Sequence, residues 1–322
     1  MRPLLALLPL LGSPNEPHDC AATRAPRGVE GGALPNLPLR TLGGLQLWAD
    51  LRWWKEWRLQ ENVWTGHCRL LDPSGTRRAW GDFQACERAL ARFRAQDAQP
   101  ELGAELVVLL HGLGRPRGAL ARLQRRLEER GFQVARLSYP STRLELAAHA
   151  DHLEGLLADL PGVERVSFVG HSLGGLLARE LLSRPEAAWR QRLSVGALVS
   201  LGTPHGGASL ADRFQGWAPV RWVLGPCVRQ TSSEAVSALP MPDVPLGAIA
   251  AGRREGGWNP LIPGDDDGVV GVSEALPVEA SDTLRVPGFH SVLMNDPQVV
   301  EAVARFLRHG SFEPEAASES EG

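Results

Sequence analysis

The stretch RVSFVGHSLGG, residues 165–175, decides how the rest of the chain is interpreted. An apolar run ends at Gly170, Ser172 stands between two glycines, and a helix-forming run begins near Leu173. A serine on such a sharp strand-to-helix turn is held in a strained conformation and exposed at the end of the strand. The same pattern occurs in ordinary glycine-rich turns, so Ser172 is a candidate nucleophile that needs support from its surroundings.

Around this turn, short apolar runs alternate with amphipathic segments. Strands are predicted at 105–110, 132–139, 163–169, 195–201, 246–251 and 283–286, and helices at 117–130, 143–160, 173–183 and 297–308. Apolar runs of this length are typical of strands that are buried on both faces. The alternation predicts an α/β fold with a mostly parallel sheet and helices on both faces.

Residues 39–99 precede this pattern and differ from it. Strands are expected at 57–71 and 76–81, joined by the turn Asp72-Pro73-Ser74-Gly75, and Asp82 is expected to cap a helix that ends near Arg94. We therefore expect a short Trp-rich β-hairpin and helix that pack on the sheet. The tryptophans of this stretch are Trp48, Trp53, Trp54, Trp57 and Trp64. Such clusters are more often core than a sugar-stacking surface.

The two ends of the chain have a different composition. Residues 1–38 are expected to form a signal peptide and a disordered leader, because residues 13–38 are rich in proline, glycine and polar residues. Arg2 and the apolar run 4–11 resemble a weak signal peptide, which favours a periplasmic or secreted protein over a cytoplasmic one. This run is too short to cross a membrane. Residues 311–322 are expected to form an acidic, disordered tail.

Charge and cysteine content exclude some classes of function. The 322 residues carry a formal net charge of −3, and this balance does not favour a nucleic-acid partner. The four cysteines include no CxxC pair, so a zinc or redox motif is not expected. Cys68 and Cys86 are compatible with a disulfide in an exported protein and equally with free, buried thiols.

A serine hydroxyl needs donors for the oxyanion that forms when it attacks a carbonyl group. The loop His111-Gly112-Leu113-Gly114 directly follows the first predicted strand of the α/β region, and its glycines let the backbone approach a ligand closely. We expect the backbone amides of Leu113 and Leu173 to form an oxyanion hole. A structural role, in which it fixes this loop, is expected for His111.

Three motifs occur together in one order: VVLLHGLG at 107–114, GHSLGG at 170–175 and LGTPHGG at 201–207. In this order they resemble the α/β-hydrolase superfamily of the lipase/esterase type, in particular bacterial triacylglycerol lipases. The resemblance covers residues 100–310 and implies an α/β-hydrolase fold for this catalytic domain. It also implies a catalytic triad in the chain order serine, acid, histidine.

The resemblance places the acid in a loop after a late strand, often before a glycine. Asp267 precedes Gly268 in the stretch GDDDGVV, with Asp265 and Asp266 as the alternatives. Three adjacent carboxylates also suggest calcium, but the spacing of a calcium-binding loop is absent, so no metal site is expected. His290, just before the last predicted helix, is then the base.

The other histidines are weaker candidates. His309 lies at a helix end next to the tail, and His205 is expected to be structural. His149 and His152 are spaced to hold a metal on one helix, but exposed helix polarity is the better interpretation.

Together these residues predict a serine hydrolase that cleaves carboxylic esters, of small molecules or lipids, through an acyl-serine and without a cofactor. Residues 203–245 break the strand–helix alternation and are expected to form a lid or a long connection. Their apolar part, 208–224, suggests transient contact with a lipid surface. The alternatives are an acyltransferase or lipid amidase that uses the same triad, and, less favoured, a non-catalytic binding module on this scaffold.

Overall fold

The computed structural model describes residues 39–40, 46–98, 101–218, 222, 224–254 and 256–313. The chain divides into two units, Met1–Pro35 and Asn36–Gly322, and every described element belongs to the second. The predicted leader, residues 1–38, and residues 314–322 of the predicted tail lie outside the described residues. Within the described residues, no helix has the length and apolar character needed to span a bilayer.

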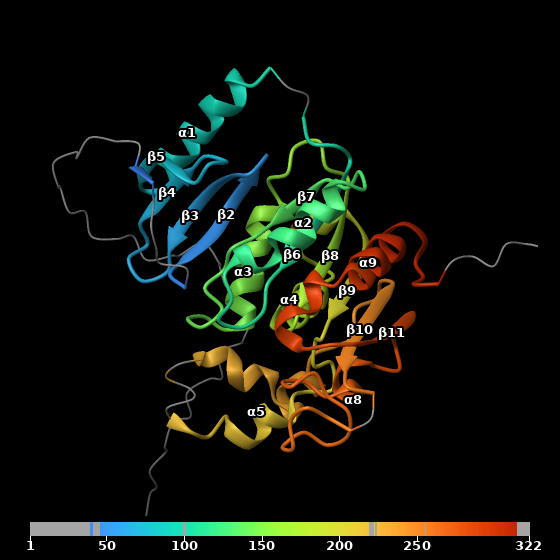
Figure 1. Ribbon diagram of the computed structural model, residues 1–322. Coiled ribbons are helices and arrows are strands. Elements are labelled where there is room, and N and C mark those ends of the chain that lie inside the picture. Colours follow the sequence, from blue (N-terminus) through green and yellow to red (C-terminus); the bar gives the residue numbers. More distant parts are fainter. Residues whose placement is uncertain are drawn as a thin grey trace, which may run out of the picture. The chain divides into compact units, whose positions relative to one another are not determined.

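A parallel sheet of six strands forms the centre of the second unit (Figure 1). Its strands are β6 (Glu105–Leu110), β7 (Val134–Arg136), β8 (Arg165–His171), β9 (Ser194–Leu201), β10 (Leu246–Gly252) and β11 (Asp282–Pro287). Their order is β11-β10-β9-β8-β6-β7, and all neighbouring pairs are parallel. The predicted α/β class is confirmed.

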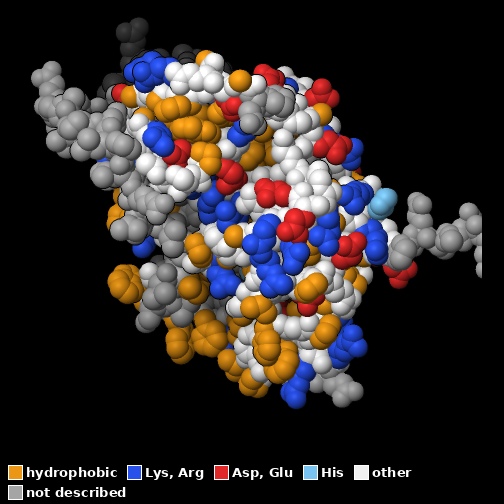
Figure 2. All heavy atoms as spheres, turned by 45° about the horizontal axis from the view of Figure 1, so that its top comes forward, with side chains coloured by type: hydrophobic (Ala, Val, Ile, Leu, Met, Phe, Trp, Pro, Cys, Tyr) orange, Lys and Arg blue, Asp and Glu red, His pale blue; other side chains and the backbone are white. Residues whose placement is uncertain are grey.

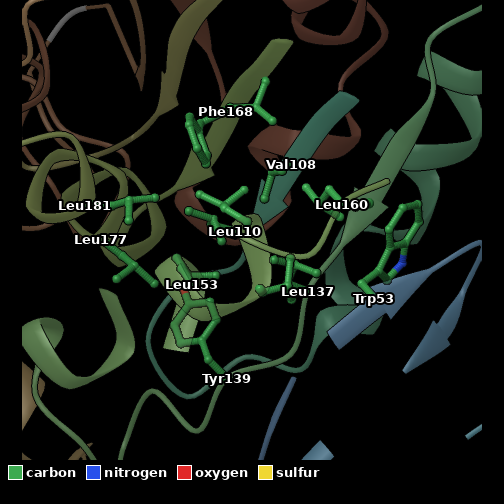
Figure 3. Close-up of a cluster of buried hydrophobic side chains, with 14 of the residues drawn as sticks. Trp53, Val108, Leu110, Leu137, Tyr139, Leu153, Leu160, Phe168, Leu177 and Leu181 are labelled. Carbon is green, nitrogen blue, oxygen red and sulfur yellow. The ribbon is translucent and has the colours of Figure 1, made fainter. Parts of the chain in front are cut away.

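Helices cover both faces of this sheet because successive side chains of a strand point to opposite faces. Val108 and Leu110 of β6 lie in one apolar cluster with α3 (Leu146–Leu157) and α4 (Leu173–Leu182) (Figure 3). Leu109, between them, lies in a second cluster with α2 (Ala121–Glu128) and α9 (Pro297–His309). The near-continuous apolar strands therefore reflect burial on both faces.

The N-terminal extension is larger than the predicted hairpin. It forms an antiparallel sheet of order β1-β5-β4-β3-β2. Its strands are β1 (Leu39–Arg40), β2 (Trp48–Trp54), β3 (Trp57–Asn62), β4 (Cys68–Leu71) and β5 (Thr76–Gly81), followed by α1 (Phe83–Gln96). The predicted single strand 57–71 is wrong, because Asn62 Oδ1 accepts hydrogen bonds from the N–H groups of Trp64 and Thr65 and turns the chain there.

Two other features of the extension agree with the sequence. The side chain of Asp82 accepts a hydrogen bond from the N–H of Ala85, so it caps α1 as predicted. Trp53 and Trp54 are buried, which confirms their interpretation as core, whereas Trp64 is 66% exposed. Strand β2 packs on α3, and the N–H of Asp50 donates to the carbonyl of Ser138, so the extension contacts the α/β region directly.

Several predicted boundaries were too wide. The helix expected at 117–130 is a 3₁₀ turn, η1 (Arg117–Leu120), followed by α2, and the strand expected at 132–139 is reduced to β7. The helix expected at 143–160 is the shorter α3. Fraying and turn formation at the ends of such elements leave little trace in the apolar pattern.

One side-chain prediction needs correction, and a second, which the sequence left open between two alternatives, is decided by the structure. His149 is not exposed: it is 1% exposed and packs edge-on against Tyr139, because α3 turns this position toward the core. Burial lowers the pKa of His149 to about 3. The thiols of Cys68 and Cys86 are both free and buried, so the structure has no disulfide between them.

The described part of residues 203–245, here called the cap segment, includes several short helices. These are α5 (Ser209–Phe214), η3 (Pro226–Thr231) and α7 (Ser233–Ser237). Figure 1 shows α5 beyond the carboxyl ends of the parallel strands, near α8 (Val272–Ala275). The N–H of Ser209 donates to the Glu274 side chain, which ties the two helices together.

Candidate active site

The parallel register brings the ends of the central strands to one edge. Leu110 of β6 pairs with Gly170 of β8, and Gly170 pairs with Ser200 of β9. The loops that follow these strands carry His111, Ser172 and Gly202, so they meet at this edge. Ligands of parallel α/β sheets bind outside the carboxyl ends of the strands, which makes this edge the candidate site.

Ser172 occupies the sharp turn between β8 and α4. Its backbone has φ 55° and ψ −123°, a conformation that costs a residue other than glycine roughly 1–3 kcal/mol. The turn is held by hydrogen bonds from the Ser172 N–H to the Leu201 carbonyl, 2.9 Å, and from Thr203 Oγ1 to the Ser172 carbonyl, 3.0 Å. The structure thus has the strained serine turn that the sequence predicts.

The glycines of this turn are required by close backbone contacts. A Cβ atom on Gly170 would collide with the backbone of Gly175, and one on Gly174 would collide with the carbonyl of Leu110. A Cβ atom on Gly112 would lie 3.1 Å from the Cβ of Ser172. The loop that carries Leu113 therefore passes directly beside the serine.

Asp267 and His290 form a buried pair. His290 Nδ1 lies 2.7 Å from Asp267 Oδ2, and the two residues are 7% and 2% exposed, respectively. Asp267 Oδ1 accepts hydrogen bonds from the N–H groups of Val269 and Val270 at 3.0 and 2.8 Å. The backbone N–H of His290 also donates to the Asp267 carbonyl, 2.9 Å. A backbone and a side-chain hydrogen bond therefore both hold His290 next to Asp267.

The two neighbouring carboxylates point elsewhere. Asp265 pairs with Arg285 and accepts from the N–H of Arg253, while Asp266 accepts from the N–H groups of Asn259 and Gly268. Because each carboxylate has its own donors, the three do not converge on a shared cation. Within the described ranges, no group of three or more His, Cys, Asp or Glu side chains is placed to hold a metal ion.

Ser172 and His290 line the same cavity, which has a volume of about 450 Å³. Leu113 and Leu173 also line it, together with cap-segment residues such as Phe214 and Val228. A larger hollow of about 850 Å³ borders the cap segment, but its described lining does not include Ser172. The structure therefore brings Ser172, Asp267, His290 and the two leucines together at one apolar cavity.

Two contacts at the site were not predicted. His171 Nε2 lies 2.9 Å from the carbonyl oxygen of His290, and burial, followed by the neighbouring His290, lowers the pKa of His171 well below its ordinary value. His171 is then neutral, and its Nε2–H donates to that carbonyl. A Cβ on Gly202 would lie 3.1 Å from His290 Nδ1 and 3.2 Å from Asp267 Oδ2, so Gly202 leaves room for the pair.

His111 and His205 have the structural surroundings expected of them. His111 stacks on Tyr139 with ring centres 4.1 Å apart, and the Tyr139 hydroxyl donates to the His111 carbonyl. His205 Nε2 lies 2.8 Å from Ser200 Oγ. Neither side chain lines the cavity that Ser172 and His290 share.

The fold and this arrangement define a class of protein. The model of the alpha/beta hydrolase family matches residues 107–315, which is more than half of the chain. The chain therefore belongs to the alpha/beta hydrolase family.

An individual relative matches a shorter part of the chain than the family model does. A Pseudomonas putida protein, 2-hydroxy-6-oxononadienedioate/2-hydroxy-6-oxononatrienedioate hydrolase 2, is 37% identical over 122 residues, which are 33% of this chain and 39% of that protein. This chain thus matches well under two thirds of that relative's length.

Solved structures with a similar fold include enzymes that act on lipids. The Bacillus licheniformis lipase BlEst2 in its propeptide form has a TM-score of 0.50 and 20% identity, over 61% of this chain and 48% of that one. Phospholipase PlaB from Legionella pneumophila has a TM-score of 0.50 and 15% identity, over 65% and 60% of the two chains. At these identities the likeness shows the fold alone.

Proposed function

We propose that this chain is a serine hydrolase that cleaves carboxylic esters through an acyl-serine intermediate. The observation that carries the proposal is the 2.7 Å hydrogen bond between His290 and Asp267 at the cavity that Ser172 also lines. Membership of a hydrolase family and the strained turn at Ser172 support it. A serine, a base and a group that orients the base are the parts that nucleophilic catalysis needs.

In the proposed reaction, His290 Nε2 accepts the proton of Ser172 Oγ while Oγ attacks the ester carbonyl carbon. Asp267 accepts a hydrogen bond from Nδ1–H, which fixes the imidazole tautomer and stabilises the imidazolium that forms. The amides of Leu113 and Leu173 donate to the oxyanion of the tetrahedral intermediate. His290 then gives its proton to the departing alcohol, and water releases the acyl group by the same steps in reverse.

Hydrolysis of p-nitrophenyl butyrate tests this proposal. Wild-type protein should release p-nitrophenol, and Ser172→Ala should lower kcat by roughly 10⁴-fold or more, because removal of the nucleophile leaves only binding and the oxyanion hole. Retained turnover in a folded Ser172→Ala variant would reject Ser172 as the nucleophile.

The same acyl-serine also serves an acyltransferase or a lipid amidase, which differ in the acceptor or in the bond cleaved. Product analysis in the presence of an added alcohol or amine separates these functions. Acyl transfer to the additive at the expense of the free acid would favour transfer, and water as the sole acceptor would favour hydrolysis.

Transient contact with a lipid surface through residues 208–224 is a further part of the proposal. Trp217 and Trp222 are 61% and 85% exposed, and tryptophan favours the membrane–water interface. Figure 2 shows hydrophobic side chains gathered along the lower edge of one face of the molecule. Co-sedimentation with phosphatidylcholine vesicles should fall in Trp222→Ala and not in Trp64→Ala, which removes an exposed tryptophan of the N-terminal sheet. Equal binding by both variants would reject this contact.

A further inference from the structure

Arg115 is a charged residue in the lining of a mostly apolar cavity. Most of the lining is aliphatic or aromatic, from residues such as Leu210, Phe214 and Val269. Among the described lining residues, Arg115 is the one that carries a permanent charge. A guanidinium at the wall of an apolar cavity is a suitable binding group for an anion, because it is planar, permanently charged and carries five N–H donors.

The backbone of Arg115 is held firmly from two sides. Its N–H donates to the Gly112 carbonyl, 3.2 Å, and its own carbonyl accepts from Gln46 Nε2, 3.2 Å. The guanidinium Nη2 donates to the Ser291 carbonyl, 2.5 Å, in the residue after His290. The side chain therefore spans from the loop of Leu113 to the loop of His290, across the edge of the site.

This hydrogen bond uses one of the five N–H donors of the guanidinium. Over the residues that the structure describes, Arg115 forms no ion pair with a carboxylate, whereas Arg117, two residues later, pairs with Glu56 at 3.0 Å. The positive charge also acts on the site: after burial and the neighbouring His290, Arg115 is among the groups that lower the pKa of His171. Arg115, whose charge is paired with no described carboxylate, thus lines the cavity where substrate would lie.

We propose that Arg115 binds an anionic group of the substrate, so that the preferred esters carry a carboxylate or a phosphate near the scissile carbonyl. This inference rests on the proposed ester hydrolysis. The planar guanidinium fork matches the oxygens of both groups, and either one supplies the missing counter-charge. The carboxylate would come from the acyl side of the ester and the phosphate from the alcohol side.

Two matched substrate pairs test this inference. On the acyl side, p-nitrophenyl hydrogen glutarate is compared with p-nitrophenyl butyrate. On the alcohol side, 1-butyrylglycerol 3-phosphate is compared with 1-butyrylglycerol. Each pair differs by one anionic group, and kcat/KM is measured for the wild-type protein, Arg115→Gln, Arg115→Lys and, as a control, Arg122→Gln, which removes an exposed arginine from α2.

In at least one pair the wild-type protein should prefer the anionic ester. Arg115→Gln should lower that preference roughly 10- to 100-fold, mainly through KM, because a charge-assisted hydrogen bond is lost. Arg115→Lys should retain part of the preference, and Arg122→Gln all of it. The pair that responds identifies the carboxylate or the phosphate as the group bound.

Equal losses on the anionic and neutral members of both pairs would overturn the inference, because Arg115 would then act only by tying the two loops together. A wild-type protein without preference in either pair would overturn it as well. Both outcomes leave ester hydrolysis intact. Absence of turnover on all four esters would instead reject the proposed function.

Discussion

Asp265 and Asp267 show how two carboxylates in one loop acquire different roles from their partners. Asp267 contacts His290, whereas Asp265 pairs with Arg285 and with backbone N–H groups. Of these contacts, the proposed mechanism uses only the one between Asp267 and His290, because that carboxylate orients the imidazole.

Asp267→Asn should therefore lower kcat for p-nitrophenyl butyrate by roughly 10⁴-fold, because an amide at this position stabilises the wrong imidazole tautomer. The amide oxygen still accepts from Val269 and Val270, so the loop should keep its fold. Asp265→Asn is the matched control and should leave kcat unchanged. A similar loss in both variants would contradict the assignment of Asp267.

The same residues show what sequence reasoning could and could not find. Ser172, Asp267 and His290 were predicted because motif order constrains them even though they are far apart in the chain. The contacts of His171 with His290 and of Arg115 with Ser291 join residues 119 and 176 positions apart. No local pattern marks such pairs, because they depend on the register of the sheet and on loop packing.

At the level of elements, the N-terminal extension reaches the proposed site through Gln46. Its Nε2 donates to the Arg115 carbonyl, and its Oε1 accepts from the N–H and the hydroxyl of Thr142 at 3.1 and 3.2 Å. Ser141 Oγ, which accepts from the Gly114 N–H, donates to the same oxygen. Gln46 thus connects the extension to the Leu113 loop, both directly and through Ser141.

Gln46→Leu should lower kcat for p-nitrophenyl butyrate by roughly tenfold, because several hydrogen bonds that position the Leu113 loop are lost and each is worth about 1 kcal/mol. Gln133→Leu is a matched control, since Gln133 also bonds backbone groups, at Gly103 and Glu105, away from the site. Gln133→Leu should keep the wild-type kcat, although its Tm should change about as much as that of Gln46→Leu. If kcat followed Tm equally in both variants, Gln46 would have no positioning role.

The strands of the parallel sheet were predicted better than those of the N-terminal extension, for physical reasons. The buried parallel strands stand out because both of their faces are apolar, as in β6 and β8. The antiparallel sheet of the extension was reduced to a hairpin because the turn after Asn62 depends on side-chain hydrogen bonds that hydropathy does not reveal. Strand β2, which lies within the cluster of tryptophans, was not predicted.

At the scale of the whole molecule, buried histidines link stability to pH. Burial lowers the pKa of His111 to about 4 and, together with a neighbouring positive group in each case, lowers the pKa values of His149 and His205 to about 3. In the unfolded chain these groups protonate near pH 6.5. Between the unfolded and folded pKa values the unfolded state binds more protons, so stability must fall as pH decreases below about 6.5.

The free energy of unfolding should therefore decrease by up to about 1.4 kcal/mol per pH unit for each such histidine. Both ring nitrogens of His149 are buried, so His149→Leu should remove one contribution and flatten the dependence between pH 6.5 and 5. His309→Gln, which changes an exposed histidine at the end of α9, should not. Urea unfolding at a series of pH values measures the slopes, and identical slopes for His149→Leu and the wild-type protein would contradict this explanation.

The central claim is that Ser172 is an activated nucleophile, and covalent labelling tests it most directly. Wild-type protein is treated with a fluorophosphonate, and the modified peptide is identified by mass spectrometry. We expect one adduct per chain, on Ser172, that is absent from Ser172→Ala and forms much more slowly in Asp267→Asn. No adduct on the folded wild-type protein, or an adduct that persists in Ser172→Ala, would contradict it.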